Sequence, residues 1–182
     1  IAYWSLVPLA LALIFLGKWR TLAVQPRFWL PNIKANLVDI IVGVSSVTLI
    51  SQAEYRAIGV MWALLYVGWL LFVKPNNTTF FVGVQSFWAQ FLGLISLFMV
   101  ANLVKLPIVM VVLVWLVGWS TARHYLSDYD EPNYKVLALI WGLLISQMSW
   151  FSLHWIQYFT ILNSNIAVFA LIVSIFSVSL GS

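Results

Sequence analysis

The chain has 182 residues, of which 63% are hydrophobic and only 8% are charged, and its mean hydropathy is +1.00. Soluble domains carry about 25% charged residues, so this composition excludes an ordinary soluble domain and predicts a polytopic membrane protein. The net charge of +4 is too small and too scattered to predict binding to nucleic acid. The absence of cysteine excludes disulfides, thiolate metal sites and cysteine nucleophiles.

Apolar stretches separated by short polar segments predict an all-α bundle of about seven transmembrane spans, forming one integral membrane domain over residues 1–182. In chain order the predicted spans are Ile1–Gly17, Asn32–Gln52, Ala57–Val73, Phe80–Val104, Ile108–Leu126, Tyr134–Leu153 and Ile166–Gly181. The last has about 16 residues, fewer than the ~20 that a bilayer requires, so six spans is the alternative. The sequence does not indicate which membrane holds the protein.

Lysine and arginine predict the orientation of the bundle. The connections after spans one, three and five hold Lys18, Arg20, Arg27, Lys34, Lys74, Arg123 and Lys135, whereas those after spans two and four hold Arg56 and Lys105. Cytoplasmic loops carry an excess of Lys and Arg. The N-terminus is therefore expected outside and the C-terminus inside.

The first connection, Lys18–Lys34, mixes basic residues with Trp19, Phe28 and Trp29. Cations beside aromatic rings suit a segment that lies on lipid headgroups, so the lipid bilayer is the expected partner and anionic lipid the sharper alternative. A connector whose basic side chains reach the interface is the simpler interpretation.

Asp39 in the second span is the strongest candidate for a functional residue. It is the only acid or base set more than about one turn inside a long apolar run, and Gly43 and Ser46 follow at i+4 and i+7 on the same helix face. Carboxylates within spans are costly, and they recur in proton and ion pathways.

Arg123 and His124 lie near the inner end of the fifth span, at a depth similar to that of Asp39. An Asp39–Arg123 pair or an Asp39–His124 proton relay is one hypothesis. The other is that Asp39, only about one turn inside, reaches interfacial water or Lys34.

Three glutamines, Gln85, Gln90 and Gln147, are expected to be buried amides by their positions inside spans. Gln90 and Gln147 are candidate polar-site residues because an amide can bind a polar solute. Hydrogen bonding between helices is the more common role of such residues.

Small residues recur at helical spacing in several spans and predict close helix contacts, either within one bundle or with a partner subunit. A pore lining is the alternative interpretation. The stripes are Gly43 and Ser46; Ser86, Ala89, Gly93 and Ser96; Gly142, Ser146, Ser149 and Ser152; and Ser174, Ser177 and Gly181.

No cofactor or metal site is predicted. His124 and His154 are expected at opposite ends of spans, most of a ~30 Å hydrocarbon core apart. The acidic loop Ser127–Asn133 lacks the spacing of an EF-hand. No lysine follows Lys135, which excludes a Schiff-base lysine in the last span.

The first function hypothesis is a non-enzymatic membrane protein that acts as a subunit or scaffold of a membrane complex with other membrane proteins. The alternative is a small-solute or ion transporter or channel that uses Asp39. A third hypothesis, an enzyme acting on lipid through the acidic loop and Arg123, lacks a base–nucleophile arrangement in the sequence.

Overall fold

The computed structural model of the protein describes residues 7–17, 28–101, 106–154, 158–161, 164–167 and 172–176. Its elements are the helices α1 (Val7–Gly17), α3 (Trp29–Gln52), α4 (Arg56–Gly68), the π-helical continuation η3 (Trp69–Val73), α5 (Thr79–Met99), α6 (Pro107–Asp128) and α7 (Tyr134–His154), followed by the strands β1 (Tyr158–Ile161) and β2 (Ser164–Ala167).

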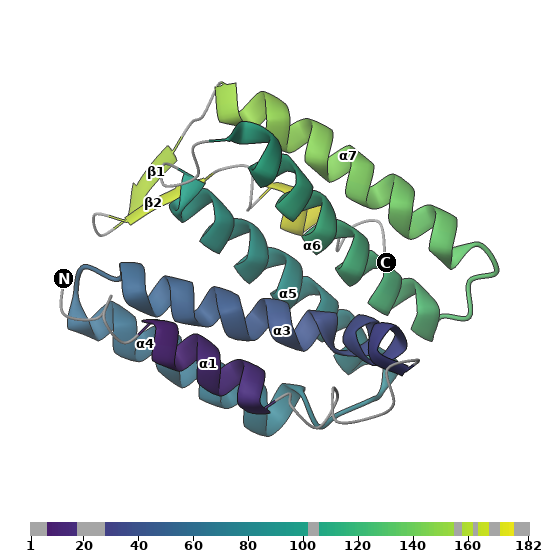
Figure 1. The fold of residues 1–182 in the computed structure, drawn as a ribbon, viewed down its shortest axis with the longest axis horizontal. Coiled ribbons are helices and arrows are strands. Elements are labelled where there is room, and N and C mark those ends of the chain that lie inside the picture. The colour runs from purple at the N-terminus through teal and green to yellow at the C-terminus, as the bar shows by residue number, and fades with distance from the viewer. Residues whose placement is uncertain are drawn as a thin grey trace.

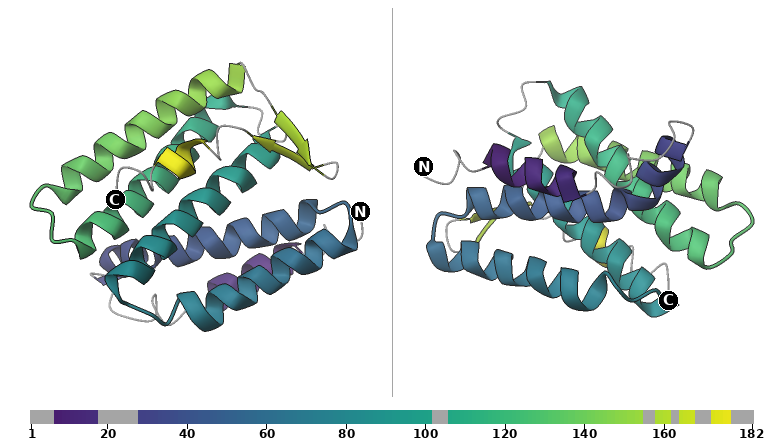
Figure 2. Two further views of the ribbon diagram at one scale, coloured as in Figure 1. Left: turned by 180° about the vertical axis from the view of Figure 1, so that it is seen from behind. Right: turned by 60° about the horizontal axis from the view of Figure 1, so that its bottom comes forward.

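The described helices form a bundle in which α3, α5, α6 and α7 follow one another side by side (Figure 1). Helices α1 and α4 both pack on α3, at the edge of the bundle away from α7 (Figure 2). Short connections join α3 to α4, α5 to α6 and α6 to α7, and each of these three pairs is antiparallel. Pro107 occupies the first turn of α6, where its missing N–H has no helical partner to lose. Asp130, in the turn before α7, has a φ of 51°, which Asp tolerates better than most residues.

Four of the described helices are long and apolar enough to cross a membrane: Arg56–Val73, Thr79–Met99, Pro107–Asp128 and Tyr134–Ser152. They correspond to predicted spans three to six and fit an integral membrane protein. Helix α1 and the apolar part of α3, Asn36–Gln52, are shorter. The count of seven spans and the outside N-terminus therefore stay predictions.

Among predicted spans two to six, two boundaries differ from the structure by three residues or more. Helix α3 begins at Trp29, three residues before the predicted Asn32, because Pro31 falls within the first turn, where a helix tolerates proline. Helix α5 ends at Met99 rather than at Val104. Residues 18–27 of the predicted lipid-contacting connection and 102–104 of the fourth span lie outside the described residues.

The predicted seventh span does not begin at Ile166. That residue belongs to β2, which pairs antiparallel with β1 in the register Tyr158↔Ala167 to Ile161↔Ser164. β-Branched and aromatic residues in 158–161 favour a strand. Residues 172–176 are helical, and the rest of this predicted span lies outside the described residues.

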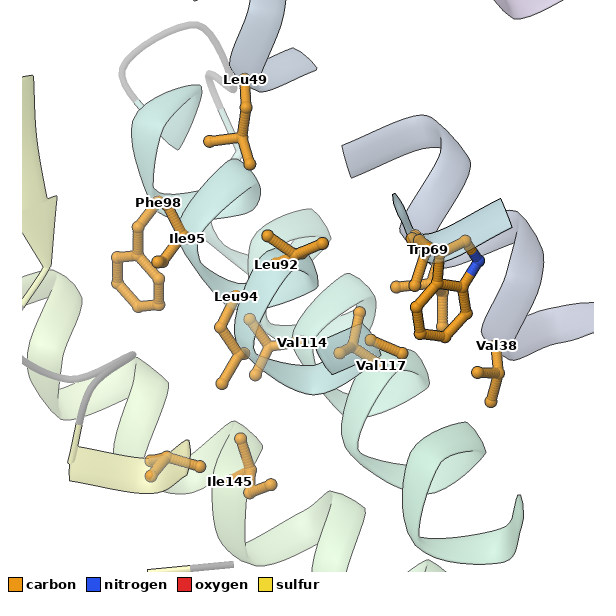
Figure 3. Packing of buried hydrophobic residues seen from close by; sticks show 14 residues of the cluster. Val38, Leu49, Trp69, Leu92, Leu94, Ile95, Phe98, Val114, Val117 and Ile145 are labelled. Carbon is orange, nitrogen blue, oxygen red and sulfur yellow. The ribbon is translucent and has the colours of Figure 1, made fainter. Parts of the chain in front are cut away.

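The core lies where α5 is held between α3 and α6. Leu94 and Val114 point toward one another from α5 and α6 in Figure 3. A Cβ placed at Gly93 would lie 2.9 Å from Val117 Cγ1 and 3.0 Å from Ile41 Cγ2. Gly93 therefore lets α5 approach both neighbours, as lipid-embedded helices require in order to associate.

A second close approach joins α6 to α7. A Cβ at Gly118 would lie 3.3 Å from Gly142 Cα, and a Cβ at Gly142 would lie 3.1 Å from the backbone oxygen of Trp115. The predicted small-residue stripes of spans four and six are confirmed as contact faces, since Ser86, Ala89, Gly93, Ser96, Gly142, Ser146 and Ser149 are buried. Ser177 and Gly181 lie outside the described residues.

Candidate functional site

Asp39 lies on α3 against the end of η3. Its Oδ2 is 2.8 Å from Lys74 Nζ, and Trp69 Nε1 donates a 3.4 Å hydrogen bond to its Oδ1. The Asp39 side chain is 15% exposed and that of Lys74 is 43% exposed. The carboxylate thus has an ammonium partner at the rim of the bundle, which makes its position within a span tolerable.

Lys74 lies beside Asp39 because α3 and α4 are antiparallel neighbours. The short turn between them brings the residue that follows η3 back beside the first half of α3. Trp69 is the first residue of η3, and Lys74 directly follows its last residue. This π-helical turn forms the end of the helix that begins as α4.

Gln85 of α5 holds the turn that carries Lys74. Its Nε2 donates to the backbone oxygens of Val73 and Asn76, both at 2.9 Å. Its Oε1 lies 3.0 Å from His124 Nε2. Because an amide oxygen only accepts, His124 donates from Nε2 in this arrangement.

These contacts define a polar cluster of Asp39, Trp69, Lys74, Gln85 and His124, which joins α3, η3, α5 and α6. Asp39 and His124 were expected at similar depth, and the cluster links them through Lys74, its turn and Gln85. The contacts between Lys74 and Gln85 pass through the backbone oxygens of Val73 and Asn76, so the proton relay between Asp39 and His124 stays a prediction.

Arg123, the other candidate partner of Asp39, has contacts of its own. Its Nη1 donates to the backbone oxygen of Lys34 at 3.4 Å, and its guanidinium carbon lies 5.9 Å from the centroid of a Trp119 ring. The hydrogen bond ties α6 to the start of α3, whereas the cation–π contact lies within α6.

Gln90 lies deeper in the bundle, where α5, α6 and α7 meet. Trp141 Nε1 donates to Gln90 Oε1 at 3.1 Å, and the Thr121 hydroxyl lies 3.2 Å from the same oxygen. Gln90 Nε2 and the nearby Ser86 Oγ are buried and have no hydrogen-bond partner among the described residues. The amide therefore joins three helices and keeps one unused donor.

Ser46 donates to the backbone oxygen of Val42 in its own helix at 2.7 Å, so its hydroxyl is satisfied locally. Its neighbour Ser45 makes the contact between helices instead, accepting from Ser96 Oγ at 3.0 Å.

Gln147 is not a buried amide: its side chain is exposed on α7. The buried face of this helix is marked by Ala138, Gly142, Ile145 and Ser149. At 100° per residue Gln147 falls on the opposite side, so the prediction for this residue was wrong.

No group of three or more His, Asp or Glu that could hold a metal ion occurs among the residues that the structure describes. The side chains of the candidate site are joined by hydrogen bonds and by the Asp39–Lys74 ion pair.

Comparisons with protein-family models, with curated proteins and with solved structures find no match for this chain.

Proposed function

We propose that this protein is a non-enzymatic subunit of a membrane complex and that the outer face of α7 contacts another membrane protein. The observation that carries the proposal is Gln147, an amide on the exposed face of a helix long enough to cross a membrane. Polar side chains within spans normally face protein or water rather than hydrocarbon.

Apolar side chains surround Gln147 on the exposed face of α7. Val136, Ile140, Leu143 and Phe151 lie within about 40° of it around the helix and are all exposed. Water does not reach such an apolar face inside a bilayer, so the amide requires another donor or acceptor there. A side chain or backbone group of a partner helix supplies one, and interhelical hydrogen bonds of this kind are worth about 1 kcal/mol.

The experiment is affinity purification in mild detergent from the native membrane, comparing the wild-type chain with Gln147→Leu. The substitution keeps the size of the side chain and removes the amide, so recovery of the partner should fall about fivefold. Leu71→Ala on η3 is the control, because Leu71 is exposed and η3 continues α4, which lies at the edge of the bundle away from α7.

Unchanged partner recovery in Gln147→Leu would reject this face as the contact. A wild-type chain that purifies alone would reject the subunit proposal itself.

A transporter that uses Asp39 is the second candidate, and the π-helical turn favours it. A cation or proton that binds Asp39 has to displace the Lys74 ammonium, which is held by the turn after η3. Binding would thereby loosen a segment that Gln85 ties to α5. Asp39→Asn in liposomes tests this mechanism: proton or sodium flux should disappear, and unchanged flux would remove the transport hypothesis.

A further inference from the structure

A cavity of about 600 Å³ lies between α5, α6 and α7. Such a volume is within the range of small-molecule sites in proteins. Its wall is mostly apolar and aromatic, and its residues include Phe80, Phe87, Tyr125, Tyr129 and Trp141.

The cavity has a polar floor formed by α5. Gln90 and Ser86 both line it, and they lie one helical turn apart on the same helix face. Gln90 is 3% exposed and Ser86 is 7% exposed, and neither Gln90 Nε2 nor Ser86 Oγ has a hydrogen-bond partner among the described residues. Burying such groups without a partner is costly.

The orientation of the Gln90 amide determines what can satisfy it. The Trp141 indole can only donate, so the amide atom that faces it must be the oxygen. The free Nε2 is therefore a donor that needs an acceptor. A hydroxyl such as that of Ser86 can donate to the same acceptor.

The walls limit the rest of the ligand. Every lining residue is uncharged, so the site favours an uncharged molecule. Phe80, Leu137 and Leu144 line the cavity and are also exposed on the outer surface of α5 and α7. In a bilayer this surface faces hydrocarbon, so the route into the cavity suits a lipid-soluble molecule.

We propose that this cavity binds one uncharged, lipid-soluble molecule through a carbonyl oxygen that accepts hydrogen bonds from Gln90 Nε2 and Ser86 Oγ. A carbonyl oxygen has two lone pairs, which matches two donors on one helix face. An ester carbonyl of a glycerolipid and a carbonyl of a long-tailed quinone share this chemistry. The proposal does not depend on the subunit role of α7.

The test uses purified protein in mild detergent and a long-chain alkyl benzophenone, a photoreactive ketone. Labelling should saturate, and the labelled peptides should come from α5, α6 and α7. A long-chain ketone should compete about fivefold or more better than the hydrocarbon of equal length, because only the ketone accepts hydrogen bonds.

Substitutions test the two hydrogen-bond donors of the polar floor separately from the space in the cavity. Ser86→Ala and Gln90→Leu should each weaken labelling about fivefold. Gly83→Leu should reduce labelling because the new side chain occupies part of the cavity. A Cβ at Gly83 meets Tyr125 Cε2 at an ordinary 3.5 Å, so a side chain can be introduced there. Gln52→Leu is the matched control, since it removes an amide at the end of α3, which does not line the cavity, and should leave labelling unchanged.

Competition by a diacylglycerol or by a long-tailed benzoquinone then identifies the source of the carbonyl. Displacement by either one supports the site and names its ligand class. Displacement by neither, or equal displacement by the ketone and the hydrocarbon, would overturn the proposal. So would full labelling of Gly83→Leu, whose fold is checked by circular dichroism.

Discussion

Replacing Gly142 with alanine tests the close approach of α6 and α7. The new Cβ would lie 3.1 Å from each of three atoms: Trp115 Cδ1, Trp115 O and Trp119 Cβ. One of these is a backbone oxygen, and the two tryptophan rings are stacked with centroids 5.7 Å apart, so the contacts give way only if the helices separate. Inserting a methyl group into such a seam costs about 1–3 kcal/mol.

Gly68→Ala supplies the reference for this change. Both glycines are helical, so each gains about 1 kcal/mol from the better helix propensity of alanine. A Cβ at Gly68 meets nothing within 4 Å. The difference between the two variants therefore isolates packing, and Gly142→Ala should be the less stable by about 1–3 kcal/mol.

The assay is unfolding in mixed micelles with increasing SDS, followed by far-ultraviolet circular dichroism. Gly68→Ala should unfold at or above the wild-type SDS fraction, and Gly142→Ala should unfold clearly below the Gly68→Ala midpoint. Equal midpoints for the two variants would refute the inference that α6 and α7 meet backbone to backbone at this glycine.

Three further substitutions address the polar contacts in the same unfolding assay. Gln85→Leu should cost about 1–3 kcal/mol because it leaves buried partners without hydrogen bonds, and a wild-type midpoint would contradict the polar cluster. Ser96→Ala should cost only about 0.6 kcal/mol through its contact with Ser45, so a loss of several kcal/mol would show that this contact is misjudged. Asp39→Asn should cost less than about 1 kcal/mol because Lys74 is partly exposed, and a collapse of the fold would be inconsistent with that exposure.

The helices of the fold were largely predictable from the sequence. Long apolar runs separated by short polar turns place spans three to six where the structure has membrane-length helices. The hairpin at 158–161 and 164–167 was not expected, because a short run of apolar and β-branched residues does not distinguish a strand from part of a buried helix.

The partners within the polar cluster were harder to predict. The position of Asp39 within a span predicts a functional residue. Lys74 contributes only to the predicted orientation, and no pattern in the sequence indicates that Trp69 is a partner of Asp39. Which helices are neighbours decides these pairings, and the sequence alone does not give that order. The antiparallel α3–α4 turn was the one available clue, since it brings the end of the third span beside the start of the second.

The error at Gln147 had a signal in the sequence. Gly142 and Ser149 were already recognised as marking a contact face, and helical periodicity puts Gln147 on the other side. A position deep within a span does not imply burial in the bundle, because a membrane helix has an outward face along its whole length. The same periodicity now makes this residue the basis of the proposed partner contact.

The mass and composition of the particle released gently from the native membrane test the central claim most directly. A subunit of a membrane complex predicts a particle larger than one chain with a partner in fixed stoichiometry, and recovery of that partner should fall about fivefold in Gln147→Leu. A single chain or a homo-oligomer would contradict the subunit role and direct attention to flux through Asp39.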